Sequence, residues 1–575
     1  MVLQNKLLTM FKNINKFIPF IFSLVFLSSA ILGYKTLVQD TLTMDESVHI
    51  PAGYSYLLTH DYRINPEHPP LIKDLSALPL LRLNLKFPIN NASWIEGIGN
   101  ITGITGEWGL GTEFFTKLNT NFDEIVFWAR IPLFLLFLAG SFFVFKWTSE
   151  LTKNKLGGLI ASFLYLFSPT LVAHGRLVTN DIGVTIFICI AIYYFIRYLN
   201  YPDNIKYIFL TGVALALAEL SKFSAIILIP YFFLAVLIIA IIKKRVFRYI
   251  VSFILVLIVA YILVGAVYYL NMYNMPVEQQ IKINKWVLGD STSAKILNTA
   301  SHSSILRPYS YYALGVLMAQ RRVMGGGNTY FLGNLSYRSF YSYFPIVFLI
   351  KEPLALVILV LVMIFYAIYL LIKKYDEIIK NLNLYLPYLM ISGFIILYGL
   401  VSIFSNLNIG IRHLIPIYPL LFILLAVFVL KLIEKYKTSI YLIFFILVFL
   451  TWYGISFFLA YPYYLSYFNE SIGGADNGYK YVVDSNLDWG QDLKRLAKWV
   501  EDNNISKIRL SYFGGGSPEY YLGNKYVRWD EPTETDWVAV SVTHLFQVKE
   551  HSYDIIEDKI PTKIIGKSIW VYKMD

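Results

Sequence analysis

Long apolar stretches, separated by short polar connections, set the pattern of this chain. A run of about 20 apolar residues can cross the hydrocarbon core of a bilayer as a helix, and such runs recur about eleven times. They lie near residues 17–37, 125–146, 156–173, 181–198, 207–221, 223–242, 249–270, 345–372, 386–404, 414–433 and 440–460. The pattern predicts a polytopic α-helical membrane protein.

Lysine and arginine are concentrated in alternate connections, for example in 146–155 and 243–248. Loops rich in these residues usually remain in the cytoplasm. With an odd number of spans, the amino end is expected inside and the carboxyl end outside. The long connections 38–124 and 271–344 and the tail 461–575 then all lie outside. We therefore expect an integral protein of the cell membrane whose working face is extracytoplasmic.

Composition agrees with this interpretation. Of 575 residues, 57% are hydrophobic and 15% are charged, and the mean hydropathy is +0.55. The formal charge of +11 is dispersed among short loops, so positive-inside topology explains it better than nucleic-acid binding does. A single cysteine, Cys189, excludes an internal disulfide and a cysteine-based metal site.

The tail 461–575 has the pattern of a small α/β domain, distinct from the membrane domain 1–460. β-Branched and aromatic residues predict strands at 480–485, 507–514, 536–542 and 568–574. Segment 486–503 is predicted to be an amphipathic helix, because Leu493, Leu496 and Val500 fall on one face.

Ionisable residues gather at the expected outer ends of the spans. Asp45 and Glu46 follow the first span in TLTMDESVHI, and Asp181 opens the fourth in GRLVTNDIG. Lys222 lies in the turn between the fifth and sixth spans, and Arg412 precedes the tenth. Carboxylates and cations on one face can hold an anion and take a proton from a nucleophile. A lipid phosphate at the membrane surface would be such an anion.

These residues also have a purely structural interpretation. Thr43 and Glu46 match a capping box, in which a threonine caps a helix and the glutamate three residues later reaches back. Asp181 can likewise cap the fourth span, and basic residues at the outer ends can anchor helices by snorkelling. Capping needs only Glu46, so it leaves Asp45 unexplained.

Six short motifs follow one another on the expected outer side: MDE at 44–46, DYRINPEHPPLIK at 61–73, GRLVTND at 175–181, LSKFSA at 220–225, YFPIVFLIKEP at 343–353 and NIGIRHLIP at 408–416. Together they resemble glycosyltransferase family 39, which includes the protein O-mannosyltransferases, over about residues 17–460. The resemblance implies the GT-C membrane fold. It also implies inverting transfer of a sugar, mannose or another hexose, from a polyprenyl-phosphate carrier to an extracytoplasmic hydroxyl on protein, lipid or glycan.

The resemblance further implies roles for individual residues. Asp45 is expected to be the general base that deprotonates the acceptor, with Glu46 supporting it and Asp181 positioning acceptor or sugar. The residues expected to neutralise the donor phosphate are His68, Lys73, Lys222, Arg412 and His413. Glu67 stands where some relatives hold a metal ion, which leaves a divalent metal open as a cofactor.

A polyprenyl-lipid flippase or transporter without glycosyl transfer is the main alternative. Such a protein is expected to place ionisable groups or broken helices near the bilayer midplane. Here the spans are nearly free of internal charge, and the acids lie at outer ends. The pattern therefore favours chemistry at the membrane surface.

Overall fold

The computed structural model describes residues 2–97, 106–436, 439–531, 535–548, 551–556 and 558–574. Residues 98–105 of the expected first outer loop lie outside these ranges. Within the ranges, nine helices are long and apolar enough to cross a membrane, or ten if one bent pair of helices counts as a span. The predicted polytopic helical fold is confirmed.

Seven of the nine spans are single helices, and two begin with a 3-10 turn, labelled η. The single helices are α1 (Val2–Gln39), α6 (Phe122–Thr152), α9 (Asn180–Asn200), α12 (Val246–Met272), α17 (Leu354–Lys373), α19 (Leu382–Ile403) and α21 (Ile440–Ala460). The other two join η3 (Phe223–Ile227) to α11 (Leu228–Ile242) and η4 (Ile411–Ile417) to α20 (Tyr418–Lys435). Eight of them coincide with a predicted apolar run, whereas the predicted run 345–372 is divided between α16 (Tyr343–Lys351) and α17.

The two remaining predicted runs form helices that depart from a simple span. Residues 156–173 form α7 (Lys155–Leu166) and α8 (Pro169–Gly175), which meet at 65°. The bend follows from Pro169, which lacks an amide hydrogen, and from Ser168, which caps the new helix. Residues 207–221 form α10 (Ile205–Ser221), whose 17 residues give it a length of about 26 Å.

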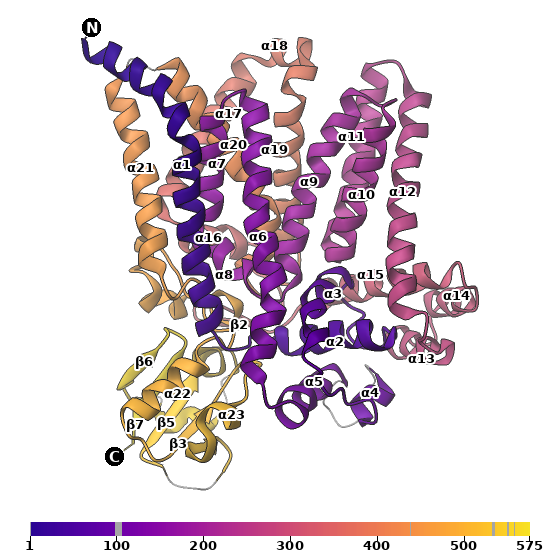
Figure 1. The fold of residues 1–575 in the computed structure, drawn as a ribbon, viewed down its shortest axis with the longest axis vertical. Helices are drawn as coiled ribbons and strands as arrows, with labels where there is room; N and C mark the ends of the chain where they lie inside the picture. The colour runs from indigo at the N-terminus through magenta and orange to yellow at the C-terminus, as the bar shows by residue number, and fades with distance from the viewer. Residues whose placement is uncertain are drawn as a thin grey trace.

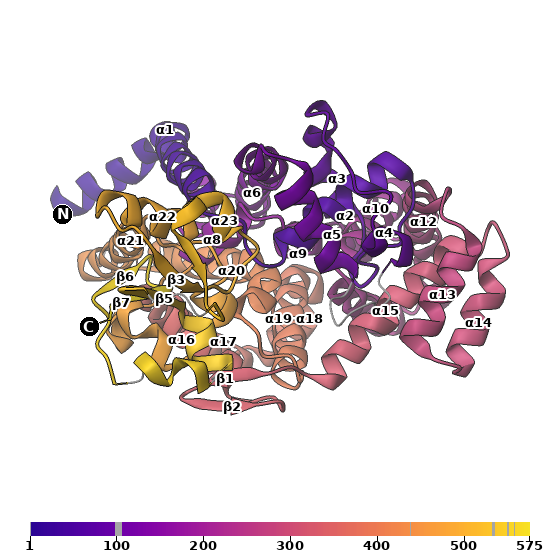
Figure 2. The same cartoon turned by 90° about the horizontal axis from the view of Figure 1, so that it is seen from below.

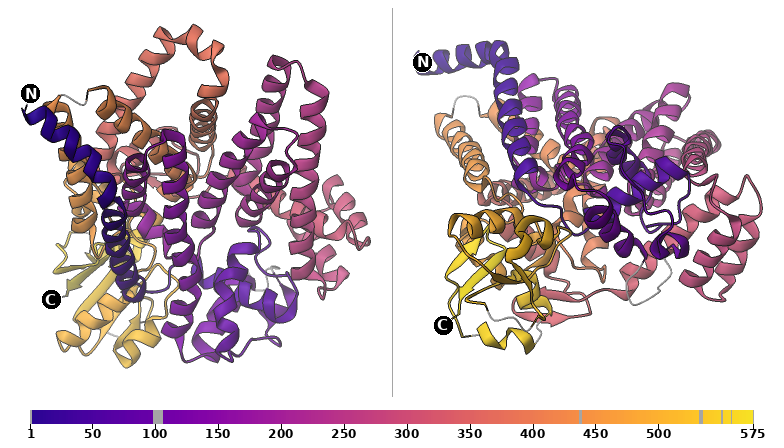
Figure 3. Two further views of the ribbon diagram at one scale, coloured as in Figure 1. Left: turned by 45° about the horizontal axis from the view of Figure 1, so that its top comes forward. Right: turned by 60° about the horizontal axis from the view of Figure 1, so that its bottom comes forward.

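The long connections lie together at one end of the bundle, here called the outer end (Figure 1, Figure 3). They form α2 (Glu46–Thr59), α3 (Leu71–Ala77), α4 (Ala92–Glu96), α5 (Gly106–Thr112), α13 (Val277–Leu288), α14 (Thr292–Ser301), α15 (Arg307–Gly325), and the hairpin of β1 (Thr329–Phe331) and β2 (Asn334–Ser336). Helix α16 (Tyr343–Lys351) leads into α17, and α18 (Tyr375–Lys380) lies at the opposite end, as does the amino terminus. The one-sided arrangement agrees with the predicted topology, and the side of the membrane that the outer end faces stays a prediction.

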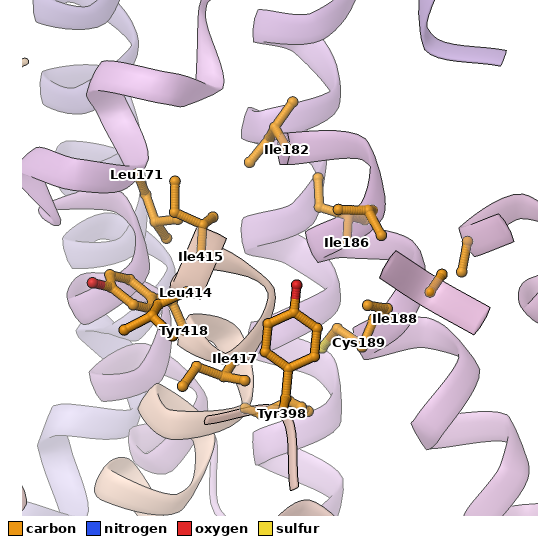
Figure 4. Close-up of a cluster of buried hydrophobic side chains, with 14 of the residues drawn as sticks. Leu171, Ile182, Ile186, Ile188, Cys189, Tyr398, Leu414, Ile415, Ile417 and Tyr418 are labelled. Carbon is orange, nitrogen blue, oxygen red and sulfur yellow. The ribbon is translucent and has the colours of Figure 1, made fainter. Parts of the chain in front are cut away.

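The centre of the bundle is formed by α9 and by the span that joins η4 to α20. Their apolar windows are 78% and 89% buried, against 28% for α17 and α19. Helix α9 packs against η4, and Figure 4 shows Ile182 and Ile186 from one and Leu414 and Ile415 from the other. The first residues of α9 and η4 are therefore held at the outer end by the most enclosed part of the fold.

The tail folds into a five-stranded sheet of order β4-β3-β5-β7-β6, which confirms the predicted α/β domain. The strands are β3 (Ile508–Ser511), β4 (Tyr526–Arg528), β5 (Trp537–Ser541), β6 (Lys563–Ile565) and β7 (Ile569–Lys573). Strand β3 is parallel to β4 and β5, and β7 is antiparallel to β5 and β6. Helix α22 (Leu493–Asp502) buries Leu493, Leu496 and Val500, as predicted, and α23 (Pro518–Leu522) follows β3. Figure 2, viewed from the outer end, shows the domain over one side of the bundle and α2 to α5 over the other.

The predicted strand at 480–485 is wrong. Lys480 ends the 3-10 turn η6 (Ala475–Lys480), Asp484 and Ser485 belong to the 3-10 turn η7 (Asp484–Asn486), and only residues 481–483 lie between the two turns. Val482 and Val483 are buried, which explains the apolar pattern in the sequence. Asp484, however, has φ of 56°, a left-handed conformation that ends an extended strand.

Gly53 in α2 allows a close approach to α3, since a Cβ there would lie 2.2 Å from the carbonyl oxygen of Lys73. The variant Gly53→Ala is expected to separate the two helices and to lower the free energy of unfolding by about 1–3 kcal/mol. Gly399→Ala in α19 is the control, because no described atom outside its own helix lies within 4 Å of that Cβ position. Thermal unfolding in detergent compares them, and equal melting temperatures would contradict the close packing.

Candidate active site

A chain of alternating charges connects four outer turns that are far apart in the sequence. The guanidinium of Arg412 donates to Asp45 Oδ2 at 2.7 Å, and the same nitrogen lies 3.8 Å from Asp181 Oδ2. Lys222 Nζ donates to Asp181 Oδ1 at 2.6 Å. The fold thus brings together four of the residues that the sequence singled out.

Helix ends position these four side chains. Asp45 directly precedes α2, and Asp181 lies in the first turn of α9, where the positive end of the helix dipole favours a carboxylate. Lys222 follows α10 in an extended conformation, and Arg412 lies in η4. Asp181 does not cap α9, because that helix begins directly after Thr179.

Of the two acids among these four residues, Asp45 is the accessible one, with 24% of its side chain exposed against 1% for Asp181. Burial alone would raise the pKa of Asp45, but the charges of Arg412 and then His49 outweigh it and hold that pKa below its usual value. Asp45 is therefore ionised at neutral pH and can accept a proton.

Several buried polar atoms in or beside this chain have no hydrogen-bond partner among the described residues. They are Asp181 Oδ2, Arg412 Nε, His413 Nε2 and both side-chain polar atoms of Asn180. A buried polar group left unpaired costs about 1–3 kcal/mol, and such groups commonly bind a ligand or ordered water. Donors beside a carboxylate suit a ligand that has both an anionic group and hydroxyls.

Glu46 lies beside Asp45 but in a different environment. Its side chain is fully buried, and the guanidinium of Arg130 donates to both carboxylate oxygens, at 2.8 and 2.6 Å. The backbone N–H groups of Thr43 and Val178 donate to it as well. Half of the predicted capping box is formed, because the Glu46 carboxylate accepts from the backbone N–H of Thr43. The Thr43 hydroxyl donates to the same carboxylate, so it does not act as the acceptor that a capping box needs.

Lys73 is likewise enclosed, with its side chain fully buried under the loop that follows α2. Its ammonium donates to the hydroxyl of Tyr56 at 2.8 Å and to the carbonyl oxygens of Asn65 and His68, each at 2.9 Å. It also lies over the rings of Tyr56 and Tyr62. Burial lowers the pKa of Lys73 to about 7.

Glu67 and His68 lie beside this loop. Glu67 accepts from Arg322 at 2.9 Å and lies 3.6 Å from His68 Nε2, and the rings of His68 and His49 meet edge to face. Within the described ranges no group of three or more His, Cys, Asp and Glu residues could hold a metal ion. A metal ion at Glu67 therefore stays a prediction.

Arg322 is a candidate that the sequence analysis missed. Half of its side chain is exposed, and its charge acts on both Asp45 and His68. The signal in the sequence was a pair of arginines before three glycines, QRRVMGGGN, within the outer connection 271–344. Only the fold shows that the end of α15 returns to Glu67.

Residues 110–269, from α5 into α12, match the family model described as dolichyl-phosphate-mannose-protein mannosyltransferase. The matched region includes Asp181 and Lys222. It confirms the resemblance predicted from the motifs and indicates a glycosyltransferase. No curated protein matches the sequence.

Two solved structures are similar in outline. The archaeal oligosaccharyltransferase AglB from Archaeoglobus fulgidus, in complex with an inhibitory peptide and a dolichol-phosphate, is 11% identical, with a TM-score of 0.48 over 92% of this chain and 70% of AglB. ArnT from Cupriavidus metallidurans, bound to undecaprenyl phosphate, is 10% identical, with a TM-score of 0.41 over 96% of this chain and 97% of ArnT. Neither likeness assigns a role to any residue here.

The buried pair of Arg130 and Glu46 gives a prediction about stability. Arg130→Met leaves the Glu46 carboxylate buried and unpaired, so it is expected to lower the free energy of unfolding by about 3–5 kcal/mol. Arg197→Met is the control, because Arg197 forms a half-exposed pair with Glu150 whose loss costs about 1 kcal/mol or less. Unfolding of both variants in detergent tests this, and a small effect of Arg130→Met would show that Glu46 has other adequate partners.

Proposed function

We propose that this protein is a membrane glycosyltransferase that moves a sugar from a polyprenyl-phosphate carrier to a hydroxyl group at the outer face of the membrane. The observation that carries the proposal is the chain Asp45–Arg412–Asp181–Lys222, with one accessible carboxylate and two cations. The family match supports the transferase class. Neither the four charged residues nor the family match identifies the sugar, or shows whether the acceptor hydroxyl is on protein, lipid or glycan.

Asp45 acts as the general base in this proposal. The acceptor oxygen attacks the anomeric carbon while its proton passes to the Asp45 carboxylate. The bond between the anomeric carbon and the phosphate oxygen breaks, and polyprenyl phosphate leaves with the electron pair. A single displacement of this kind inverts the configuration at the anomeric carbon.

Arg412 and Lys222 neutralise the negative charge that develops on the leaving phosphate. Charged donors fixed in place before reaction are effective because they need no reorganisation. Asp181 pairs with Lys222 and lies near Arg412, so it holds both cations in position. His413, whose Nε2 has no described partner, and Arg322 supply further donors at the same site.

Two of the roles implied by the family resemblance are revised. Glu46 is saturated by Arg130 and two backbone amides, so it fixes the turn that carries Asp45 and does not exchange protons. Lys73 is saturated by neighbouring oxygens, so it fixes the loop that carries His68 and does not contact the phosphate. No step of the reaction passes through a metal at Glu67.

Asp45→Asn is expected to lower kcat by about 10²–10⁴-fold, because the amide cannot accept the proton. Folding and donor binding should be retained. Glu113→Gln is the control in the same outer region, since among the described residues Glu113 forms an ion pair only with the exposed Lys117. Transfer from labelled polyprenyl-phosphate mannose to a membrane extract measures the effect, and near-normal turnover by Asp45→Asn would refute its role as base.

The same donor separates the enzyme from a flippase. Purified protein in vesicles is given labelled polyprenyl-phosphate mannose in one leaflet. Release of the sugar from the lipid supports the transferase, with inverted configuration in the product. Movement of the intact lipid to the other leaflet, without cleavage, supports the flippase.

Lys222→Met is expected to lower kcat by about 10²–10³-fold, as the loss of one fixed donor to a developing oxyanion typically does. Lys206→Met is the matched control, because Lys206 is an exposed lysine at the opposite end of the same helix, α10. Steady-state kinetics with the labelled donor compare them. Equal kcat in the two variants would remove Lys222 from the mechanism.

A further inference from the structure

A short segment of the tail, residues 485–491, lies against the loop that carries Asp45. The backbone N–H of Thr41 donates to the carbonyl of Gln491 at 2.9 Å, and that of Met44 donates to the carbonyl of Trp489 at 3.1 Å. Two strand-like bonds therefore fix the residues directly before Asp45. Gln491 and Trp489 lie in the tail, outside the six motifs of the membrane domain.

The same segment also fixes the loop that carries Arg412. The Ser485 hydroxyl donates to the carbonyl of Ile409 at 2.6 Å, and the side-chain oxygen of Asn486 accepts from the N–H of Ile411 at 2.9 Å. One stretch of chain thus binds the two loops that supply the partners of an ion pair separated by 367 positions.

Trp489 contacts the ion pair itself. Its side chain is buried, 1% exposed, and the guanidinium carbon of Arg412 lies 4.3 Å from the centre of its ring. A desolvated guanidinium over an indole face is held by about 2 kcal/mol. Arg412 is therefore held between the Asp45 carboxylate on one side and the indole on another.

The segment is anchored in the sheet domain. The side chain of Asp488 accepts from the backbone N–H of Thr543, two residues after β5, at 2.9 Å, and the Thr543 hydroxyl donates to the Asp488 carbonyl. Asp488 is fully buried, and this burial raises its pKa to about 8. A rigid domain thus presents Trp489 to the site.

We propose that segment 485–491 is part of the active site, and that Trp489 is the residue that positions Arg412 against Asp45. The inference rests on the proposed function in so far as the pair is catalytic. It gives the tail a place in the reaction itself: the domain completes the site from outside the membrane. A domain that only bound the acceptor would need none of these contacts.

The pKa of Asp45 depends on the charged groups around it, so a change in this pKa can reveal a movement of Arg412. Arg412, His49 and Arg322 lower the pKa of Asp45, and Asp484 faces it as a like charge. Among these, Arg412 acts most strongly. If Arg412 moves away, the pKa of Asp45 rises, and the acid limb of the rate profile moves to higher pH.

The test compares Trp489→Leu, Trp489→Phe and a control. Trp489→Leu removes the aromatic face and is expected to lower kcat/KM by about 10–30-fold and to move the acid limb to higher pH. Trp489→Phe keeps a ring and should remain within about 3-fold of the parent. Trp499→Leu is the control, because Trp499 packs edge to face against Trp537 within the same domain. It is expected to lower stability without moving the acid limb.

A second readout does not depend on turnover. The rate at which phenylglyoxal modifies Arg412, measured by peptide mass spectrometry, should be low in the parent and in Trp499→Leu. This rate should rise about 10-fold in Trp489→Leu, because the guanidinium of Arg412 is then no longer packed against an indole ring. The ratio to modification of the exposed Arg248 corrects for reagent activity.

The outcomes separate the two proposals. If the parent transfers no sugar but Arg412 reactivity rises only in Trp489→Leu, the positioning stands and the proposed function fails. If the parent transfers sugar, and Trp489→Leu changes neither the acid limb nor Arg412 reactivity, the positioning is overturned while the function stands. Equal shifts in Trp489→Leu and Trp499→Leu would also overturn it, because a general loss of domain stability would then explain both.

Discussion

The guanidinium of Arg130 organises the outer end of the bundle. All five of its N–H donors are used, two toward Glu46 and three toward the backbone carbonyls of Leu37, Asp40 and Thr41. A buried cation needs such complete pairing to offset its desolvation. As a result the turn between α1 and α2 has one conformation, and Asp45, the residue before Glu46, is directed toward Arg412.

The same turn connects the membrane domain to the tail. The Asp40 carboxylate pairs with Arg176, directly after α8, at 2.6 Å and with Arg495 of α22 at 2.7 Å. Three separate segments thus share one buried carboxylate, so the tail cannot rotate without breaking both ion pairs. The membrane bundle and the sheet domain behave as one unit around this turn.

Much of this fold follows from the sequence, because membrane-spanning helices satisfy their backbone groups locally and carry a long apolar signal. The assembly of Asp45, Asp181, Lys222 and Arg412 at one end followed from topology alone. Their pairing did not, since no local pattern encodes contacts between residues 45 and 412. The family resemblance of HPPLIK implies that Lys73 binds the donor phosphate, whereas in the structure its ammonium donates to the carbonyl oxygens of the loop above it.

The place of segment 485–491 has a consequence for how the protein is made. Asp45, Asp181, Lys222 and Arg412 are all synthesised before the last span, α21, ends at Ala460. The residues that hold the two loops together are synthesised later, after this span, and can dock only then. During synthesis the chain therefore carries these four charged residues without their final spacing, and that spacing is reached only when the tail has folded.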